Sequence, residues 1–465
     1  MPRSYPPPDS PERPHPPFAT RPLIPVYPPP ADLLHPKPAL PTPSRSPSVV
    51  HLGSTQFSVS THLVPAAHLR SVPQDIPIPP PPGPEVTDKR ARRAAFDKIR
   101  VRLADIRRDV ATERTHSGFP NVLWACVNRY VPVRSGAGGS GSRSGANGKG
   151  LTLFFAHANG FHKETWEPTI TNLLSPPGAE NVNEIWSWEA VQHGDAALIN
   201  RDKLCAIYDW TDNARDISNF LLYFLPTKTT AASLPLHLPR IPDEETQERL
   251  DRGFRGRTFV AVGHSFGGCT SVLAALTYPR LFSSIILVDP VIVQPRLYEN
   301  TNDPFLEKMS LGAIVRRDTW ESRSEAHQLM LKNPFFQAWD PSALALFVEH
   351  GLYATPSGSV HLKMPGVQEG ISFLERLTPY EVWERLPHVD ERITLHWIMP
   401  GKEGGDRDFG GPTHHRVRVW RRAKNASNVI VETAGHLIPQ EDPKACAREI
   451  QAFLEKRYSG AKSRL

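Results

Sequence analysis

The amino-acid sequence predicts an α/β fold with a mostly parallel central sheet flanked by helices. Apolar segments of strand length alternate along the chain with segments of helical periodicity, which is the pattern of strands joined by helical crossovers. One such strand, in "FVAVGHSFGGCTSVLAAL" (259–276), runs through a glycine-flanked serine directly into a helix. About 100 residues of helical character then separate two later strands, and an insertion this long in a parallel sheet is usually functional. A helical cap is therefore expected after the strand that ends near Asp289.

Residue types and their spacing place the individual elements. β-Branched and aromatic residues favour strands, whereas Phe96, Ile99 and Leu103 recur at helical spacing opposite a face rich in arginine. That helix is expected to present a solvated basic side. The expected strands lie within 54–65, 121–133, 151–160, 183–191, 258–263, 283–292, 393–401 and 428–435. The expected helices outside the cap lie within 88–114, 212–225, 269–279 and 443–458.

Composition divides the chain into a tail and one domain. Of the 49 prolines, 26 lie in the first 84 residues, and such segments favour extended conformations that bury little surface. Residues 1–50 are therefore predicted to be a disordered, proline-rich tail, and residues 51–465 to form the domain. The domain is expected to contain a basic helix insertion at about 86–115, a Gly/Ser-rich loop at 135–150 and the cap at about 291–392.

Charge, cysteine usage and hydropathy argue against several classes of protein. Residues 1–150 carry 20 Lys and Arg against 10 Asp and Glu, and the remaining residues carry 34 against 38, so we expect no nucleic-acid surface. The four cysteines are widely spaced without a CxxC pair, which favours buried thiols over disulfides or zinc. The segment "MPRSYPPPDS" has no apolar core and no uncharged apolar run approaches 18 residues, so we expect neither a secretory signal nor a transmembrane segment. We also expect no metal site and no cofactor.

The pentapeptide "GHSFG" fits the G-x-S-x-G turn, in which a serine sits between a strand and a helix with its hydroxyl above the sheet. Gly263 and Gly267 are needed because the tight turn leaves no room for side chains two positions on either side of the serine. The motif follows an apolar strand and opens a helix, which is the structural context it requires. Ser265 is therefore predicted to be a nucleophile.

A serine hydroxyl needs a base, and a histidine must supply it. His436, in "ETAGHLIPQEDP", follows the last predicted strand and precedes the last helix, where this kind of fold presents its base. His264 and His157 are expected to shape the site and not to carry protons.

A carboxylate is needed to hold the imidazole in the correct tautomer, and the residues themselves leave two positions open. Asp289 ends the strand after the nucleophile helix. Glu403 and Asp406 follow the next strand, which is the commoner position for the acid.

Backbone N–H groups are expected to stabilise an oxyanion. Phe266, directly after the serine, supplies one, and "FFAHANGFHKETW" supplies the other through Asn159, with Gly160 in the same turn.

On these motifs the chain resembles the α/β-hydrolase superfamily over roughly residues 50–457. "AHANGFHKETWEP", "GHSFGG", "LVDPVI" and "GHLIP", together with the C-terminal "SRL", are similar to the fungal peroxisomal lipase and toxin-biosynthesis hydrolase group. The resemblance implies an α/β-hydrolase fold. It also favours Asp289 over Glu403 or Asp406, because a carboxylate follows the corresponding strand in that group.

The predicted function is hydrolysis of an ester or thioester of a hydrophobic acyl chain by a serine esterase or lipase. Ser265 would attack the carbonyl, His436 would transfer the proton, and Asp289 would orient His436. The alternatives are an acyltransferase or thioesterase in peroxisomal, toxin-like secondary metabolism and, more remotely, a non-catalytic binding protein whose proline-rich tail docks SH3-like modules.

The last three residues, Ser463, Arg464 and Leu465, resemble the peroxisomal address S-K-L. They predict the peroxisomal matrix as location and the import receptor as partner, with a cytoplasmic location if the tripeptide does not function.

Overall fold

The structure is a computed structural model. It describes residues 2–8, 18–41, 48–52, 55–73, 75–83, 85–112, 121–133, 150–175, 181–229, 233–295, 304–402 and 411–458.

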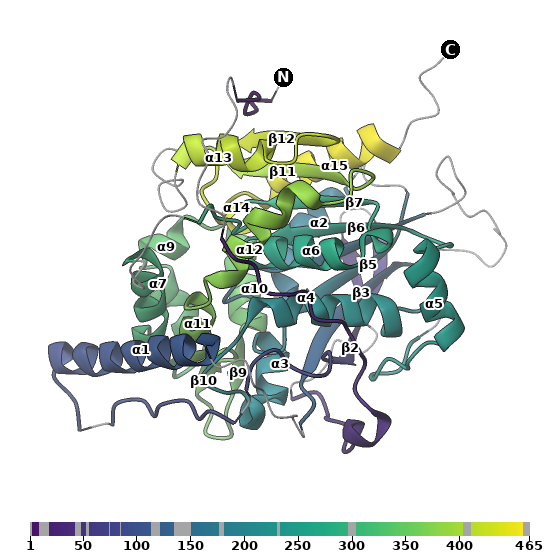
Figure 1. Cartoon of the computed structure of the whole chain (residues 1–465). Helices are drawn as coiled ribbons and strands as arrows, with labels where there is room; N and C mark the ends of the chain where they lie inside the picture. The colour runs from purple at the N-terminus through teal and green to yellow at the C-terminus, as the bar shows by residue number, and fades with distance from the viewer. Residues whose placement is uncertain are drawn as a thin grey trace, which may run out of the picture.

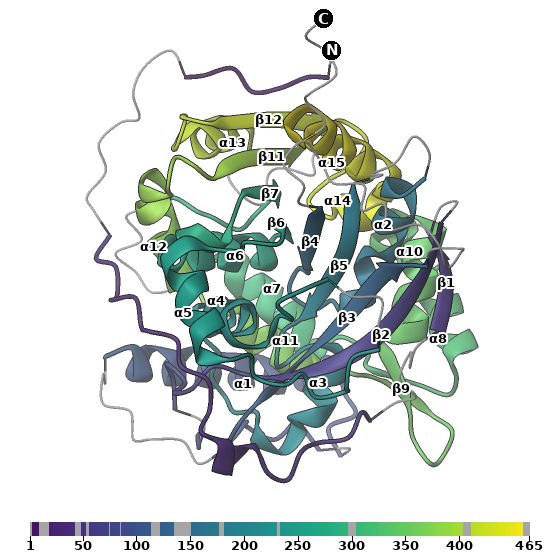
Figure 2. The same ribbon diagram turned by 90° about the vertical axis from the view of Figure 1, so that its right-hand side faces the viewer.

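A single large sheet forms the centre of the domain (Figures 1 and 2). In the described part of the chain it has nine strands in the order β1-β2-β3-β5-β4-β6-β7-β11-β12. The first three pairings are antiparallel and the remaining five are parallel, so the predicted mostly parallel α/β sheet is confirmed. In spatial order the strands are β1 (Ser48–Leu52), β2 (Thr55–Pro65), β3 (Trp124–Pro132), β5 (Val182–Glu189), β4 (Leu151–Ala156), β6 (Thr258–His264), β7 (Ser284–Val288), β11 (Thr394–Pro400) and β12 (Ala426–Val431).

Helices cover both faces of this sheet, as Figure 2 shows. One face packs on α4 (Trp210–Asn219), α6 (Phe266–Thr277) and α12 (Leu377–Arg385), and the other packs on α2 (Glu167–Leu173) and α15 (Pro443–Tyr458). Successive side chains of β4 enter different cores: Phe154 lies in the first and Phe155 in the second. Because both faces are buried, the parallel strands are continuous apolar runs and do not alternate.

The remaining helices lie at the ends of the strands and on the periphery. They are α1 (Lys89–Thr112), α3 (Gly194–Ile199), α5 (Asp243–Arg252), α13 (Gly411–Trp420) and α14 (Ile438–Glu441). The predicted basic helix is α1, whose Leu103 and Ile106 are buried in the first core and which also contacts the cap. The predicted Gly/Ser-rich loop lies outside the described residues except for Gly150. No described helix is long and apolar enough to cross a membrane.

The segment between β7 and β11 forms the cap. Its helices are α7 (Pro304–Val315), α8 (Arg323–Met330), α9 (Pro334–Gln337), α10 (Pro341–His350), α11 (Gly366–Phe373) and α12. A small antiparallel sheet, absent from the prediction, also lies here: β8 (Thr319–Trp320), β10 (Val360–Leu362) and β9 (Leu352–Ala354). Strands of two or three residues are too short to show a period-2 pattern, so sequence reasoning did not detect them.

The expectation of a disordered tail over residues 1–50 is wrong for much of the described N-terminus. Residues 18–26, which we call the strap, lie along the domain. Arg21 of the strap bonds to Asp209 and Glu381. Tyr5 is 9% exposed and its hydroxyl lies 3.3 Å from Nδ1 of His415. An extended proline-rich segment has no core of its own, but it can pack on a domain that supplies charge partners, and composition does not register such partners.

Candidate active site

Ser265 stands at the turn between β6 and α6, at the edge of the sheet where the parallel strands end. Its backbone adopts φ 54° and ψ −116°, a strained conformation for a residue with a side chain. A Cβ at Gly263 or Gly267 would collide with neighbouring backbone: that of Gly268 in the first case, and the carbonyl of Ala156 in the second. The two glycines therefore permit the close packing of strand and helix that this turn requires.

Ser265, His436 and Asp289 form one hydrogen-bonded chain. Oγ of Ser265 lies 3.0 Å from Nε2 of His436, and Nδ1 of His436 lies 2.6 Å from Oδ2 of Asp289. Because an ionised carboxylate only accepts hydrogen bonds, Nδ1 of His436 carries the proton and the lone pair of Nε2 faces the serine. This tautomer is the one in which a histidine can take a proton from a hydroxyl.

Arg418 of α13 completes this chain, and sequence reasoning missed it. Its Nη2 donates to Oδ1 of Asp289 at 2.6 Å, and its Nη1 donates to the carbonyl of Pro290 at 2.6 Å. Burial by itself raises the pKa of the Asp289 carboxyl, but the Arg418 guanidinium and the hydrogen bond from His436 outweigh burial and hold that pKa well below its usual range. The carboxylate is therefore ionised at neutral pH.

Two features account for the place of Asp289. The residue has φ 32°, and its N–H donates to Ile398 of β11, so the chain turns sharply where β7 ends. The alternative acids Glu403 and Asp406 lie outside the described residues.

No signal for Arg418 was visible in the sequence, because one arginine in "HHRVRVW" looks like any other until α13 packs against the end of β7.

Removing the guanidinium from Asp289 is expected to destabilise the fold. In Arg418→Met a buried carboxylate would lose its cation, which typically costs about 3–5 kcal/mol of unfolding free energy. Guanidinium-chloride unfolding followed by tryptophan fluorescence would measure the loss. The matched control is Arg416→Met on the same helix, because Arg416 donates to the carbonyls of Pro6 and Pro7 at the exposed surface. If Arg418→Met and Arg416→Met lost the same unfolding free energy, the result would contradict a stabilising role for the Arg418–Asp289 ion pair.

The predicted oxyanion donors lie in the expected segments. Phe266 is the first residue of α6, and Asn159 lies in the turn after β4. The side chain of Asn159 accepts a hydrogen bond from His193 at 3.1 Å and donates to the carbonyl of Glu369 at 3.4 Å, so the cap and the core both hold it. Neither backbone N–H has a hydrogen-bond partner among the described residues. Both are available to a negatively charged oxygen.

The turn of Asn159 is fixed from the cap side as well. Gly160 has φ 83°, and a Cβ there would lie 2.8 Å from the carboxylate of Glu369, which pairs with Arg316. Only glycine fits this conformation beside that carboxylate without strain.

His157 and His264 are buried imidazoles close to the site. Burial lowers the pKa of His157 to about 4 and that of His264 to about 3. Nε2 of His157 accepts from the N–H of Ala190 at 3.2 Å, and Nε2 of His264 lies 2.8 Å from the carbonyl of His436. These contacts hold the neighbouring loops in place.

A buried group of charges anchors the segment after β4. Nζ of Lys163 lies 2.7 Å from Oδ2 of Asp195 and 3.2 Å from Glu189, while Nζ of Lys363 in the cap lies 2.6 Å from Oδ1 of Asp195. Burial alone lowers the pKa of Lys163, but the surrounding carboxylates outweigh it and raise the pKa well above its usual value. Asp195 therefore ties the cap to the core beside the Asn159 turn. The sequence indicated that "HKETW" belongs to the segment beside the site, but it did not indicate that Glu189, Asp195 and Lys363 anchor that segment.

Two cavities lie in the described part of the chain apart from Ser265. A crevice of about 10 Å³, enough for one water, lies between Gly160 and Arg316 of the cap, and a pocket of about 500 Å³ lies elsewhere. Ser265 lines neither of them. No cluster of three or more His, Cys, Asp or Glu side chains placed to hold a metal ion occurs within the described ranges.

A serine on a strained strand-to-helix turn, backed by a histidine and a buried carboxylate in a mostly parallel sheet, defines the class of α/β hydrolases. The chain belongs to the Alpha/beta hydrolase family, which it matches over residues 153–449. The family resemblance and the fold expected from the sequence are thereby confirmed.

The individual proteins that this chain resembles share only about a quarter of its residues or fewer over the matched regions. The chain is 24% identical over 301 residues, 64% of its length, to a type I acyl-CoA thioesterase, mpaH, of Penicillium brevicompactum. The match spans 51% of that relative. This chain is also 26% identical over 226 residues to the abhydrolase domain-containing protein ACTT2-1 of Alternaria alternata. That match covers 42% of this chain and 83% of that protein. The solved peroxisomal α/β-hydrolase Lpx1 of Saccharomyces cerevisiae has the same fold, with a TM-score of 0.59 and 17% identity over 88% of this chain and 91% of that one.

Proposed function

We propose that the chain is a serine hydrolase that cleaves thioesters or esters of hydrophobic acyl chains without a cofactor. The observation that carries the proposal is the 3.0 Å contact between Oγ of Ser265 and Nε2 of His436. The contact lies on a turn whose backbone strain lifts the serine off the sheet. An activated serine is the group that acyl transfer requires.

The residues suggest a two-stage reaction. In the first stage Oγ of Ser265 attacks the acyl carbonyl while His436 takes the hydroxyl proton, and the imidazolium is stabilised by Asp289. The N–H groups of Asn159 and Phe266 hold the negative oxygen. Collapse expels the thiolate or alkoxide, to which His436 returns the proton. In the second stage water, deprotonated by His436, releases the acid and restores the serine.

The Penicillium relatives are type I acyl-CoA thioesterases, which supports a thioester as substrate. The chain covers only about half the length of those relatives, so the preference has to be tested on this protein.

A matched panel of p-nitrophenyl esters and acyl-CoAs, from acetyl to palmitoyl, is the experiment that tests the function. Each buried CH₂ contributes about 0.8 kcal/mol, so the step from acetyl to octanoyl is expected to raise kcat/KM by at least about tenfold in the preferred series. An optimum at acetyl would contradict a hydrophobic acyl site. Faster acyl transfer to an added alcohol or amine than to water would favour the acyltransferase alternative.

We further propose that the protein works in the peroxisomal matrix. The support is the C-terminal "SRL" and the fold shared with a peroxisomal hydrolase of yeast. A fluorescent protein fused to the N-terminus is expected to give punctate, peroxisomal fluorescence, and the same fusion lacking Ser463, Arg464 and Leu465 is expected to become cytosolic. A fusion with Arg464→Lys, which restores the S-K-L form, serves as the control and should stay punctate. Puncta that persist after deletion would disprove the role of the tripeptide.

A further inference from the structure

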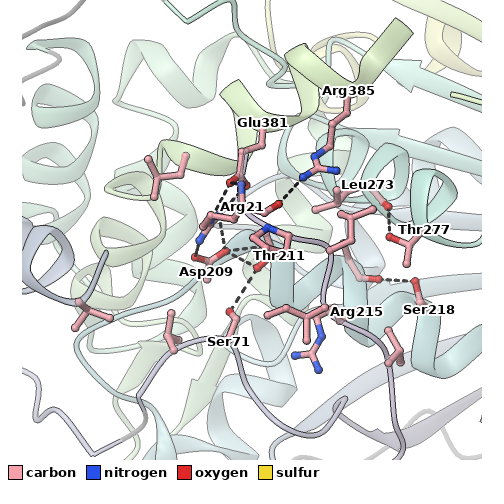
Figure 3. Close-up of a pocket in the computed structure, with 18 of the residues that line it drawn as sticks. Arg21, Ser71, Asp209, Thr211, Arg215, Ser218, Leu273, Thr277, Glu381 and Arg385 are labelled. Carbon is pink, nitrogen blue, oxygen red and sulfur yellow. Dashed lines mark hydrogen bonds and ion pairs between the residues drawn. The ribbon is translucent and has the colours of Figure 1, made fainter. Parts of the chain in front are cut away.

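A pocket of about 500 Å³ lies away from Ser265, between the strap and the helical face of the domain (Figure 3). The strap forms one wall. The segment leading into α4, α4 itself and the far half of α6 form the opposite wall, and α12 closes one end. The volume falls in the range of about 300–1,000 Å³ that small-molecule sites occupy.

The walls of the pocket are mainly apolar. Leu23 and Ile24 of the strap line it while remaining 38% and 44% exposed, although large aliphatic side chains are usually buried. Ala214 of α4 and Leu273 of α6 face them from the domain. The strap thus presents apolar side chains to a space that they do not fill, which suits an apolar chain lying between strap and helices.

The charges around the pocket are unequal. Its lining contains four arginines, Arg21, Arg107, Arg215 and Arg385, but only two carboxylates, Asp209 and Glu381. Arg21 pairs with both of these carboxylates, so they are already engaged.

Carboxylates behind the lining neutralise two further arginines. Arg107 reaches Glu375 and Arg215 reaches Asp212. Arg385 has no ion-pair partner in the described part of the chain. Its one hydrogen bond there goes to the carbonyl of Arg21. In Figure 3 its guanidinium lies directly beside Arg21 at the end of the pocket closed by α12. An anion at this point would meet an unpaired guanidinium and would not have to displace an existing carboxylate.

The pocket is separate from the serine site. None of Ser265, His436, Asp289, Asn159 and Phe266 lines it. Along α6, Leu273 comes eight residues after Ser265, which is about 12 Å of helix.

We propose that this pocket is a second, non-catalytic site that binds an amphipathic carboxylic acid of the fatty-acid class. The carboxylate pairs with Arg385, and the chain lies between Leu23 and Ile24 of the strap and Leu273 of α6. A planar guanidinium is suited to holding a carboxylate through two parallel hydrogen bonds. The proposal does not depend on any chemistry at Ser265.

Binding of dodecanoate to the full-length protein, measured by calorimetry, tests the proposal. The serine site is first occupied with a dodecyl fluorophosphonate, or Ser265→Ala is used if the serine does not react. Saturable binding of one dodecanoate per chain is expected, and dodecanol, which has the same chain without the charge, is expected to bind at least tenfold more weakly. Equal affinity for acid and alcohol would overturn the assignment of the carboxylate to Arg385.

Variants locate the site. Arg385→Gln is expected to weaken dodecanoate binding by about tenfold or more, whereas Arg280→Gln is expected to leave it unchanged. Arg280 is the matched control because it is an exposed arginine that also donates to backbone carbonyls, those of Leu250 and Asp251. Ala19→Trp places bulk in the pocket from the exposed strap, where it does not disturb the core, and is expected to abolish binding. Unchanged affinity in both Arg385→Gln and Ala19→Trp would overturn the proposal.

A photoreactive diazirine analogue of dodecanoic acid gives an independent readout that does not rely on substitutions. Peptide mapping is expected to find the label on the strap and on α6 or α12. Fragmentation of the labelled peptides assigns the label to single residues, and a label confined to Ser265, His436 or the residues adjacent to them would place the ligand in the serine site and overturn the second site.

Discussion

Replacing Ser265 with alanine is expected to lower kcat by about 10⁶-fold on the best substrate of the acyl panel. In serine hydrolases the loss of the nucleophile alone removes nearly the whole contribution of the serine, histidine and acid, because the three groups act as a unit. The residual rate would come from the N–H groups of Asn159 and Phe266 and from substrate binding. The same variant is expected to lose labelling by a fluorophosphonate probe, which reacts with activated serines.

The control for this variant is Ser271→Ala on the same helix. Ser271 is fully buried and donates to the carbonyl of Gly267 at 2.7 Å, so it tests the removal of a nearby hydroxyl that has no histidine beside it. It should keep both labelling and turnover. If folded wild-type protein is not labelled, or if Ser265→Ala keeps its activity, the nucleophile assignment is disproved and the binding-protein alternative becomes the better account.

Replacing Asp289 with asparagine is expected to reduce kcat by about 10⁴-fold with a much smaller effect on KM. The amide preserves the shape of the side chain but can donate a hydrogen bond to Nδ1 of His436, which favours the tautomer with the proton on Nε2. In that tautomer the histidine no longer accepts the proton of Ser265. Pre-steady-state acylation by a p-nitrophenyl ester would show the loss as a slower burst.

Glu403→Gln and Asp406→Asn are the matched controls, because those two carboxylates follow the neighbouring strand β11. Both variants are expected to keep wild-type kcat. A 10⁴-fold loss in either, together with near-normal Asp289→Asn, would move the acid to the position after β11. Thermal unfolding must accompany these assays, since Asp289→Asn also removes the anionic partner of Arg418.

The sequence was most informative where the structure is local. The turn at Ser265 requires glycine at 263 and 267 because backbone would collide with any Cβ there. Both glycines belong to one pentapeptide, "GHSFG", so the motif can be recognised from the sequence alone. The strands are recognisable for a similar reason: a strand buried on both faces must be apolar throughout, as in β6 and β7. His436 was identified from its place between the last strand and the last helix.

Composition misled where a segment depends on partners elsewhere in the chain. From its composition the strap was expected to belong to a disordered, proline-rich tail. In the structure Arg21 bonds to Asp209 and Glu381, which are 188 and 360 residues away in the chain. The small strands of the cap were missed because each gains its stability from neighbours and not from its own pattern.

The sequence by itself determined the α/β class, eight of the nine strands described in the central sheet, and the candidate serine and histidine, because each depends on residues close together in the chain. The tertiary structure decided which carboxylate meets His436, that Arg418 neutralises it across 129 residues, and that a pocket forms between strap and helices. These features are contacts between distant segments. Their free energy comes from packing and charge pairing that exist only after the sheet has brought the segments together.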